Sequence, residues 1–176
     1  MLQDNCFYFI KEQYYIDFLD NGLMKNHETV NGNKHSRPCF YIFKDSSNPE
    51  IYWLIPISSK YQKYKDIHDK KVKRYGSCKT IVLGYVLNQK RAFLIQNMCP
   101  VTSKYIDEKY ILNGATVTIG DKLRRKLYHS TKDTLFLYEK HNANYLIFPD
   151  VKKIKRELIR QLEQEKEIAK IGRAHV

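Results

Sequence analysis

Short apolar and aromatic runs make up much of the first two thirds of the chain, whereas further on the apolar residues recur at helical spacing. Runs rich in β-branched and aromatic residues, bounded by turn formers, predict strands. We expect strands at residues 6–10, 37–43, 51–57, 79–86, 91–95, 110–112, 115–117 and 145–148. Apolar residues at three- and four-residue steps predict helices over residues 11–19, 60–75, 121–138 and 150–162, and a short helix is expected over 103–108.

Two of these strands, residues 37–43 and 51–57, are expected to form an antiparallel hairpin. The residues between them include Asp-Ser-Ser-Asn-Pro, which is dense in turn formers. Consecutive antiparallel strands bring the start of the first beside the end of the second. Arg37 should therefore lie beside Ser58 and Ser59. The polar residues 25–36 are predicted to be a loop.

The strand at residues 51–57 ends at Pro56-Ile57 and is followed by Ser58, Ser59 and Lys60. Two hydroxyls can donate to and accept from phosphate oxygens, and an ammonium beside them can neutralise negative charge. We interpret this end of the strand as a surface that faces an RNA phosphodiester. The alternative is a strand end that runs into a solvated basic helix, in which Ser59 only caps that helix.

The charge of the chain also favours a polyanionic partner. The formal net charge is +12, and 14 tyrosines are available to stack on unpaired bases. Charge alone does not separate RNA from DNA or from an anionic membrane. However, no apolar run approaches the ~20 residues that a bilayer span needs. The four cysteines lack Cys-x-x-Cys spacing, so we expect reduced thiols, no structural zinc and a cytoplasmic protein.

The reaction expected from these residues needs no metal or other cofactor. The sequence has no glycine-rich phosphate loop and no pair of carboxylates at a strand end. RNA can be cleaved without them when its own 2′-OH attacks the adjacent phosphorus, which leaves a 2′,3′-cyclic phosphate and a 5′-OH. Tyr14 and His35 are candidates for proton transfer. The expected catalytic set is Ser59, Ser58, Lys60, Arg37 and Tyr14.

Basic residues near this set predict a groove for nucleic acid. The helix after Lys60 carries a dense run of lysines, which directly follows the hydroxyl pair. Such a run is also typical of a solvated helix face. The expected RNA-binding residues are His35, Lys63, Lys65, Lys71, Lys73, Arg74, Lys79, Asn97 and Arg125.

Four sequence segments together resemble a known family. They are Phe7-Tyr8-x-Ile10-x-x-x-Tyr14, Arg37-Pro38, Ile55-Pro56-Ile57-Ser58-Ser59-Lys60 and Met98-Cys99-Pro100-Val101. In order and spacing, they resemble the endoribonuclease toxins of type III toxin–antitoxin systems, the ToxN, AbiQ and CptN group, and the CptN-like branch above all. The resemblance implies a strongly twisted antiparallel sheet flanked by helices, metal-independent RNA cleavage, and inhibition by a repeated, pseudoknotted RNA antitoxin. It also implies closed rings of toxin and antitoxin, and cellular or phage RNA as substrate.

The same resemblance assigns roles to single residues. It matches Ser59 to the family's serine that is tied most closely to cleavage, Ser58 to its Thr/Ser, Arg37 to a Lys/Arg before the strand, and Tyr14 to the tyrosine of the first helix. Many members have proline and then lysine after the serine, whereas here Lys60 follows directly. Either Lys60 or Lys63 is then the functional lysine, and we favour Lys60.

Several of these residues also have structural explanations. Tyr14 would pack in the core, and Arg37 would pair with Asp17 or Glu50 on the surface. The protein as a whole could be a non-catalytic module that binds structured RNA. A DNA-binding regulator is a third hypothesis, but no helix-turn-helix pattern supports it.

We therefore predict an α+β fold with a strongly twisted, partly barrel-like antiparallel sheet and a long C-terminal helix. Residues 1–162 are expected to form a single endoribonuclease domain. Residues 163–176 are expected to be a fraying helix end and a non-native tail, because residues 171–176 resemble translated sequencing-adapter sequence.

Overall fold

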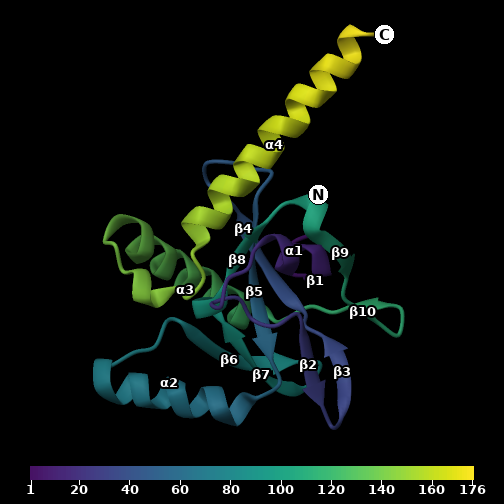
Figure 1. The fold of residues 1–176 in the computed structure, drawn as a ribbon. Helices are drawn as coiled ribbons and strands as arrows, with labels where there is room; N and C mark the ends of the chain where they lie inside the picture. Colours follow the sequence, from purple (N-terminus) through teal and green to yellow (C-terminus); the bar gives the residue numbers. More distant parts are fainter.

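Strand β5 (Tyr52–Ser58) forms the centre of the protein, and all seven of its residues are buried. The computed structural model describes all 176 residues. The main sheet is antiparallel, with the order β6-β7-β5-β4-β1-β9, and β8 also pairs with β5 (Figure 1). Its other strands are β1 (Phe7–Ile10), β4 (Cys39–Lys44), β6 (Ile81–Val86), β7 (Gln89–Leu94), β8 (Cys99–Val101) and β9 (Ile106–Lys109).

The neighbours of β5 change along its length. Strand β4 pairs with one edge, whereas on the other edge β8 pairs with the first half and β7 with the second. Pro56 lies between the last residue paired with β8, Leu54, and the first paired with β7, Ile57. The N–H of Ile57 donates to Pro38 O on the β4 side, so the nitrogen of Pro56 faces the opposite edge, where the partner changes. A proline there removes no ladder hydrogen bond.

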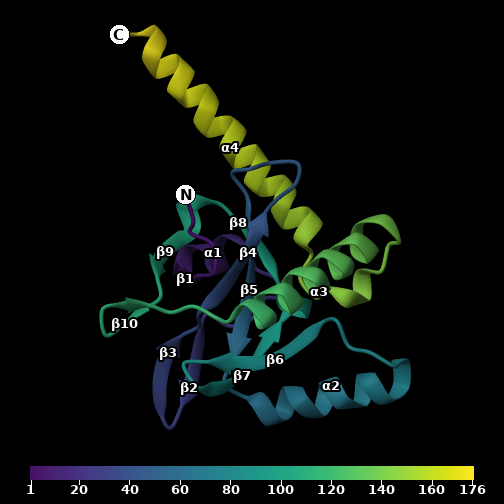
Figure 2. The same ribbon diagram turned by 180° about the vertical axis from the view of Figure 1, so that it is seen from behind.

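Alternation along β5 sends side chains into two hydrophobic clusters on opposite faces of the sheet. Trp53, Ile55 and Ile57 belong to one cluster, and Tyr52 and Leu54 to the other. Two helices cover the second cluster, α1 (Glu12–Asp17) and the start of α4 (Val151–Ala174). Helix α3 (Asp121–Lys140) covers the first cluster, and α2 (Tyr61–Tyr75) lies along β6 and β7 (Figure 2).

These features confirm the α+β class, the antiparallel sheet and the long C-terminal helix. The partly barrel-like form is not observed, because β6 and β9 each pair on one side only and the sheet stays open. A smaller hairpin, β10 (Ile111–Leu112) and β11 (Ala115–Thr116), turns at Asn113 and Gly114 as predicted. No helix is long and apolar enough to cross a bilayer.

Residues 25–36 are not the predicted loop. They form the hairpin β2 (His27–Val30) and β3 (Asn33–Ser36), which is a separate two-stranded sheet. Its turn residues Asn31 and Gly32 have φ values of 51° and 79°, as a type I′ turn requires. The prediction was wrong because the strands are short and polar, and every residue of β3 is exposed.

Two further elements differ from the prediction. Residues 145–148 are not a strand, because residues Asn144–Leu146 form a single 3₁₀ turn, η3. Residues 103–108 are not one helix either: the 3₁₀ turn η2 (Ser103–Tyr105) leads directly into β9. A third 3₁₀ turn, η1 (Ile95–Asn97), follows β7. Beyond residue 162, where we expected fraying, α4 continues as an exposed helix to Ala174.

Asp45 fixes the turn between β4 and β5 and also connects that turn to α4. Its Oδ1 accepts from Trp53 Nε1 at 3.0 Å and pairs with Lys155 Nζ at 2.9 Å. Its Oδ2 accepts from the Oγ of Ser47 at 2.7 Å and from the N–H groups of Ser47 and Asn48 at 3.0 and 3.1 Å. Burial alone raises the pKa of Asp45, but these hydrogen bonds outweigh it and lower the pKa below the usual value.

We expect Asp45→Ala to lower the free energy of unfolding by about 3 kcal/mol, because Trp53 Nε1 and the Lys155 ammonium lose their partner. The exposed Asp107→Ala should change it by less than about 0.5 kcal/mol. Since folding lowers the Asp45 pKa, the part of the wild-type advantage due to the ionised carboxylate should be full above the unfolded pKa of about 3.9 and decline as the pH falls from there through the lower folded pKa. Urea unfolding at pH 7 and at pH 3 measures both effects. Equal stability of Asp45→Ala and Asp107→Ala at pH 7 would contradict this account.

A hydroxyl and guanidinium cluster at the end of β5

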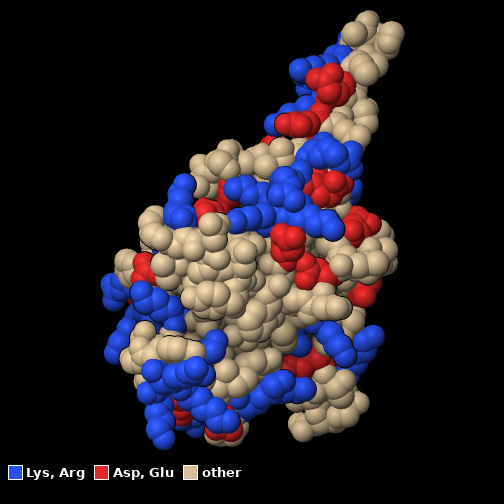
Figure 3. Space-filling model, turned by 60° about the vertical axis from the view of Figure 1, so that its left-hand side comes forward, with Lys and Arg blue, Asp and Glu red and all other residues tan.

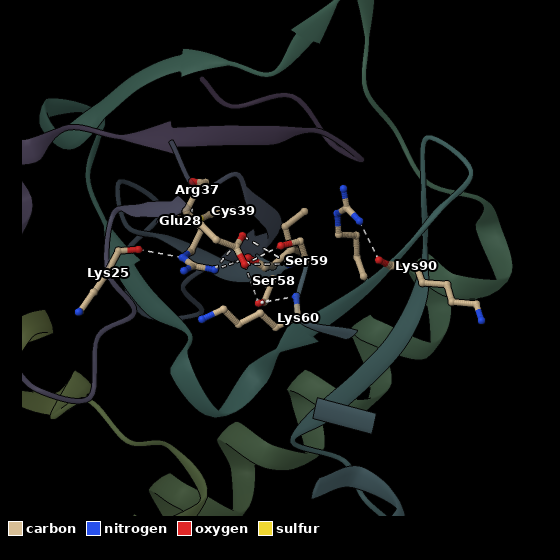
Figure 4. A network of polar contacts seen from close by, with 10 residues as sticks. Lys25, Glu28, Arg37, Cys39, Ser58, Ser59, Lys60 and Lys90 are labelled. Atoms are coloured by element: carbon tan, nitrogen blue, oxygen red, sulfur yellow. Dashed lines mark hydrogen bonds and ion pairs between the residues drawn. The ribbon is translucent and has the colours of Figure 1, made fainter. Parts of the chain in front are cut away.

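Two serine hydroxyls and a backbone N–H at the end of β5 point at one carboxylate. Glu28 Oε1 accepts from Ser58 Oγ at 3.1 Å, from Ser59 Oγ at 2.8 Å and from Ser59 N at 3.2 Å. Glu28 Oε2 lies 3.4 Å from Ser59 N. Figure 4 shows these side chains converging from β5 and the β2–β3 hairpin. The three donors therefore form a cradle for an anion.

Arg37 completes this cradle and is held independently of the carboxylate. Its Nη1 lies 3.6 Å from Glu28 Oε2, and its side chain is only 6% exposed. Its Nε donates to Lys25 O and its Nη1 to Ile57 O, each at 2.8 Å. The predicted proximity of Arg37 to the serine pair is therefore confirmed. The surface partners Asp17 and Glu50 are not used, because Asp17 accepts from Tyr105 and Glu50 pairs with Lys166.

Ser59 does not cap α2. Lys60 occupies the N-cap position, and no side chain there makes a capping hydrogen bond. The Ser59 hydroxyl is directed to Glu28 instead, while the Ser58 hydroxyl also accepts from Lys60 N at 3.2 Å. Both hydroxyls therefore belong to the cluster at the end of β5, and the structure does not support the capping interpretation.

Two cavities meet at Glu28. One, of about 410 Å³, is basic, and its lining includes Ser58, Lys25, Lys60 and Lys63. The other, of about 550 Å³, contains Ser59 and has more apolar and aromatic walls. The rings of Phe9 and Tyr110 stack against each other in the lining of this second cavity, with their centroids 5.4 Å apart. Both cavities are large enough for part of a nucleotide.

His35 lies opposite Glu28 in the β2–β3 register and lines the second cavity. Directly opposite residues of an antiparallel pair project to the same face. His35 is therefore close to the cluster, whereas Lys60 and Lys63 approach it from the first cavity. The structure places these three predicted residues around the carboxylate.

Tyr14 is not in the cluster. Its side chain is fully buried in the second hydrophobic cluster, and its hydroxyl donates to Pro100 O at 2.8 Å. Burial, with smaller effects from Cys99 and other neighbours, raises the pKa of Tyr14 well above its usual value. The structure therefore supports the packing interpretation of Tyr14.

Several predicted RNA-binding residues lie away from the cluster. Asn97 is buried and donates to Gly22 O at 2.8 Å, and Arg125 lines a different cavity with Asp121 and Tyr128. Lys79 pairs with Asp133 at 2.8 Å. These three residues are not brought together with the serines.

The remaining predicted residues lie along α2. Lys65 pairs with Asp69, Lys71 Nζ donates to Thr80 Oγ1 at 3.1 Å, and Arg74 lies over the Tyr75 ring. Lys73 belongs to the last turn of the same helix. Figure 3 shows Lys and Arg side chains gathered over α2 at the bottom of this face, with a second basic band at the height of the first turns of α4. Uncharged surface separates the two bands.

Glu28 is the residue of this site that the sequence did not identify. It lies in the segment predicted to be a loop, where a carboxylate carries no motif. It is, however, the only acidic residue between Asp20 and Asp45. Two signals could have been used: the Asn31-Gly32 dipeptide, which is typical of a type I′ hairpin turn, and a lone acid among basic and polar residues beside that turn.

No group of three or more His, Cys, Asp or Glu side chains is placed to hold a metal ion. Four free cysteines are present, and burial raises the pKa of Cys99 to about 12.

The fold defined by this open sheet and its helices has a counterpart among solved structures. No protein-family model and no curated protein sequence matches the chain. The structure is similar to that of AbiQ, described as a lactococcal anti-phage endoribonuclease belonging to the type III toxin–antitoxin system. The TM-score is 0.61, and the match covers 92% of this chain and 99% of AbiQ at 13% sequence identity. At this identity, the likeness establishes the fold alone.

We expect Tyr14→Phe to lower the free energy of unfolding by about 1 kcal/mol, because the carbonyl of Pro100 loses a buried donor. RNA cleavage, the activity implied by the sequence resemblance, should remain within about twofold of wild type, whereas loss of a proton-transfer group costs about 100-fold or more. Thermal unfolding and initial cleavage rates of the two proteins are the measurements. A 100-fold loss of cleavage with unchanged stability would return Tyr14 to the catalytic set.

Proposed function

We propose that this protein is an endoribonuclease toxin of a type III toxin–antitoxin system, from the CptN-like branch. The observation that carries the proposal is the anion cradle at the end of β5. There the Arg37 guanidinium, two serine hydroxyls and the Ser59 N–H surround one position. The fold shared with an endoribonuclease supports it, as does the net charge of +12.

In this proposal the cradle holds the phosphate that is cleaved. Its donors would bind the non-bridging oxygens and stabilise the negative charge that grows on them as the 2′-OH attacks phosphorus. Arg37 is already fixed by two backbone carbonyls, so little reorganisation is needed during the reaction. Ser59 would donate to a phosphate oxygen or orient the 2′-OH. No serine ester is formed, because the attacking and leaving oxygens both belong to RNA.

The two cavities would receive the nucleotides on either side of this phosphate. Lys60 and Lys63 in the basic cavity would neutralise the flanking backbone. A base would fit against Tyr110 in the other cavity, where His35 also lies and where a proton-transfer group is needed. Products would be a 2′,3′-cyclic phosphate and a 5′-OH, and no metal would take part.

The partners proposed here follow from the same assignment. A repeated, pseudoknotted RNA antitoxin would inhibit the toxin and assemble with it into closed rings in the cytoplasm. Residues 1–162 would form the endoribonuclease domain, and residues 163–176 would contribute nothing to catalysis. Cellular or phage RNA would be the substrate.

A module that binds structured RNA without cleaving it is the second candidate. The occupied cradle favours it, because both serine hydroxyls already donate to Glu28. The basic residues of α2 would serve such a module equally well. Turnover of RNA separates the two functions.

We expect the purified protein to cleave single-stranded RNA in EDTA and to leave cyclic-phosphate ends. Ser59→Ala should slow cleavage by about 100-fold or more, since one preorganised donor to the developing charge is lost. RNA binding should remain, because the guanidinium and lysines are unchanged. Mass spectrometry of the product ends and a filter-binding assay provide the measurements.

The control for this experiment is Ser103→Ala, which removes an exposed hydroxyl at the start of η2. Its rate should match wild type. RNA that stays intact with wild-type protein, under conditions in which it binds, would favour the binding module. Cleavage by Ser59→Ala at the wild-type rate would remove Ser59 from the mechanism.

Lys60 and Lys63 can be compared directly because both line the basic cavity. We expect Lys60→Met to reduce kcat by about 10-fold or more, since Lys60 directly follows the two serines and its backbone N–H donates to Ser58 Oγ, and Lys63→Met mainly to raise KM. Lys140→Met, an exposed change of equal charge at the end of α3, is the control. Single-turnover rates at saturating protein separate these effects. A larger loss of kcat for Lys63→Met than for Lys60→Met would identify Lys63 as the functional lysine.

A further inference from the structure

We infer that the Glu28 carboxylate occupies the phosphate position of the cradle and must withdraw before RNA can bind there. The inference rests on the proposed function and deepens it, because it makes the β2–β3 hairpin a built-in competitor of the substrate. The carboxylate takes all three donors at the end of β5 and approaches the guanidinium. An ionised phosphate group binds the same kinds of donor, namely hydroxyl, N–H and guanidinium groups.

The Glu28 carboxylate and an RNA phosphate cannot both accept hydrogen bonds from the donors of the cradle. A serine hydroxyl has one hydrogen to donate, and in the structure both hydrogens point to Glu28 Oε1. The single N–H of Ser59 is also directed at that carboxylate. A phosphate held by the same groups would also repel the carboxylate at close range, in a site where the Glu28 side chain is only 11% exposed. Binding of one therefore requires departure of the other.

The position of Glu28 also divides the space into which RNA would enter. It lines both cavities, with Ser58 in the basic one and Ser59 in the more apolar one. Withdrawal of the carboxylate would join them past the ends of the two serines. A strand of RNA needs such a continuous path, since its phosphate lies between two nucleotides.

The hairpin that carries Glu28 is not a part of the main sheet, so its displacement would break no strand pairing of that sheet. Its strands pair only with each other, and β3 is exposed along its whole length. At its root, Arg37 N donates to Asn26 O at 2.7 Å. Asn26 and His27 contact the exposed Glu12 there, at 2.8 and 3.1 Å. In Figure 1 the hairpin extends from the body beside the end of β5.

The cradle itself does not depend on Glu28. Arg37 keeps its bonds to Lys25 O and Ile57 O, and the end of β5 is held in the sheet by β7. Removing the carboxylate therefore exposes a preformed set of donors. This distinguishes a competitor from a general base, which would have to remain beside the 2′-OH throughout the reaction.

The first experiment measures binding of a 2′-O-methyl RNA oligonucleotide, which cannot be cleaved by 2′-OH attack. The variants are Glu28→Gln, which keeps the size of the side chain, and Glu28→Ala. We expect both to lower Kd by about 10-fold or more, the scale of one charge-assisted hydrogen bond. Glu108→Gln, an exposed change of equal charge on β9, is the control and should change Kd by less than about twofold.

A second substitution tests whether the gain in RNA affinity comes from the released serine donor. Adding Ser59→Ala to Glu28→Gln should remove most of the gain in affinity, because the phosphate then loses a donor that Glu28→Gln had released. Cleavage of unmodified RNA by Glu28→Gln should show a lower KM and an undiminished kcat. A kcat reduced about 100-fold or more at unchanged Kd would identify Glu28 as a catalytic base and overturn the inference.

The wild-type protein provides a test that does not depend on how the variants fold. Saturating 2′-O-methyl RNA should shift the backbone amide resonances of Glu28 and Thr29 by more than those of Glu108. Unshifted Glu28 and Thr29 signals, or Glu28→Gln binding no tighter than Glu108→Gln, would overturn the inference. If no protein cleaves RNA while the Ser59-dependent gain in binding is seen, the inference stands and the nuclease assignment fails.

Discussion

Strand β5 is paired along both edges, and this pairing holds the two hydrophobic clusters and the serine pair in place. Its backbone is held by β4 on one side and by β8 and then β7 on the other. Side chains buried on both faces join the two hydrophobic clusters through this one strand. Ser58 is its last residue and keeps the β7 pairing, so the hydroxyls are presented from the most restrained part of the fold.

The electrostatics of the cluster follow from this rigidity. Arg37 is buried because carbonyl groups of Lys25 and Ile57 receive two of its N–H groups, and an anion then balances its charge. In the structure that anion is Glu28. The phosphate of a bound RNA would balance the charge of the same guanidinium equally well. The site therefore stabilises negative charge at one position, whether a side chain or a ligand supplies that charge. We infer that the hairpin decides this, because its strands pair only with each other and not with the main sheet.

Five strands of the main sheet, β1, β4, β5, β6 and β7, were predictable because they lie in largely apolar runs, and turn residues indicated the β4–β5 hairpin. Strands β8 and β9 were not predicted, since β8 has three residues and β9 has the sequence Ile-Asp-Glu-Lys. The same argument placed Arg37 beside the serines. It failed for residues 25–36, since these four-residue strands are polar apart from Val30 and give no alternation of apolar and polar positions. The need for a proton-transfer group and the family resemblance placed Tyr14 in the catalytic set, although only the packing around Pro100 shows where its hydroxyl points. Glu28 was missed because it lies in one of these short polar strands.

Sequence spacing therefore located the donors of the site but not the carboxylate that they bind. Spacing along the chain located the groups that would touch the phosphate, because those groups are at the ends of apolar strands. It could not locate the carboxylate that opposes them, since Glu28 lies 30 residues from Ser58 on a polar hairpin. A group that competes with a ligand needs no apolar surroundings and no fixed spacing from the site. Such groups are visible only once the donors they occupy are seen in three dimensions, as they are around Glu28 Oε1.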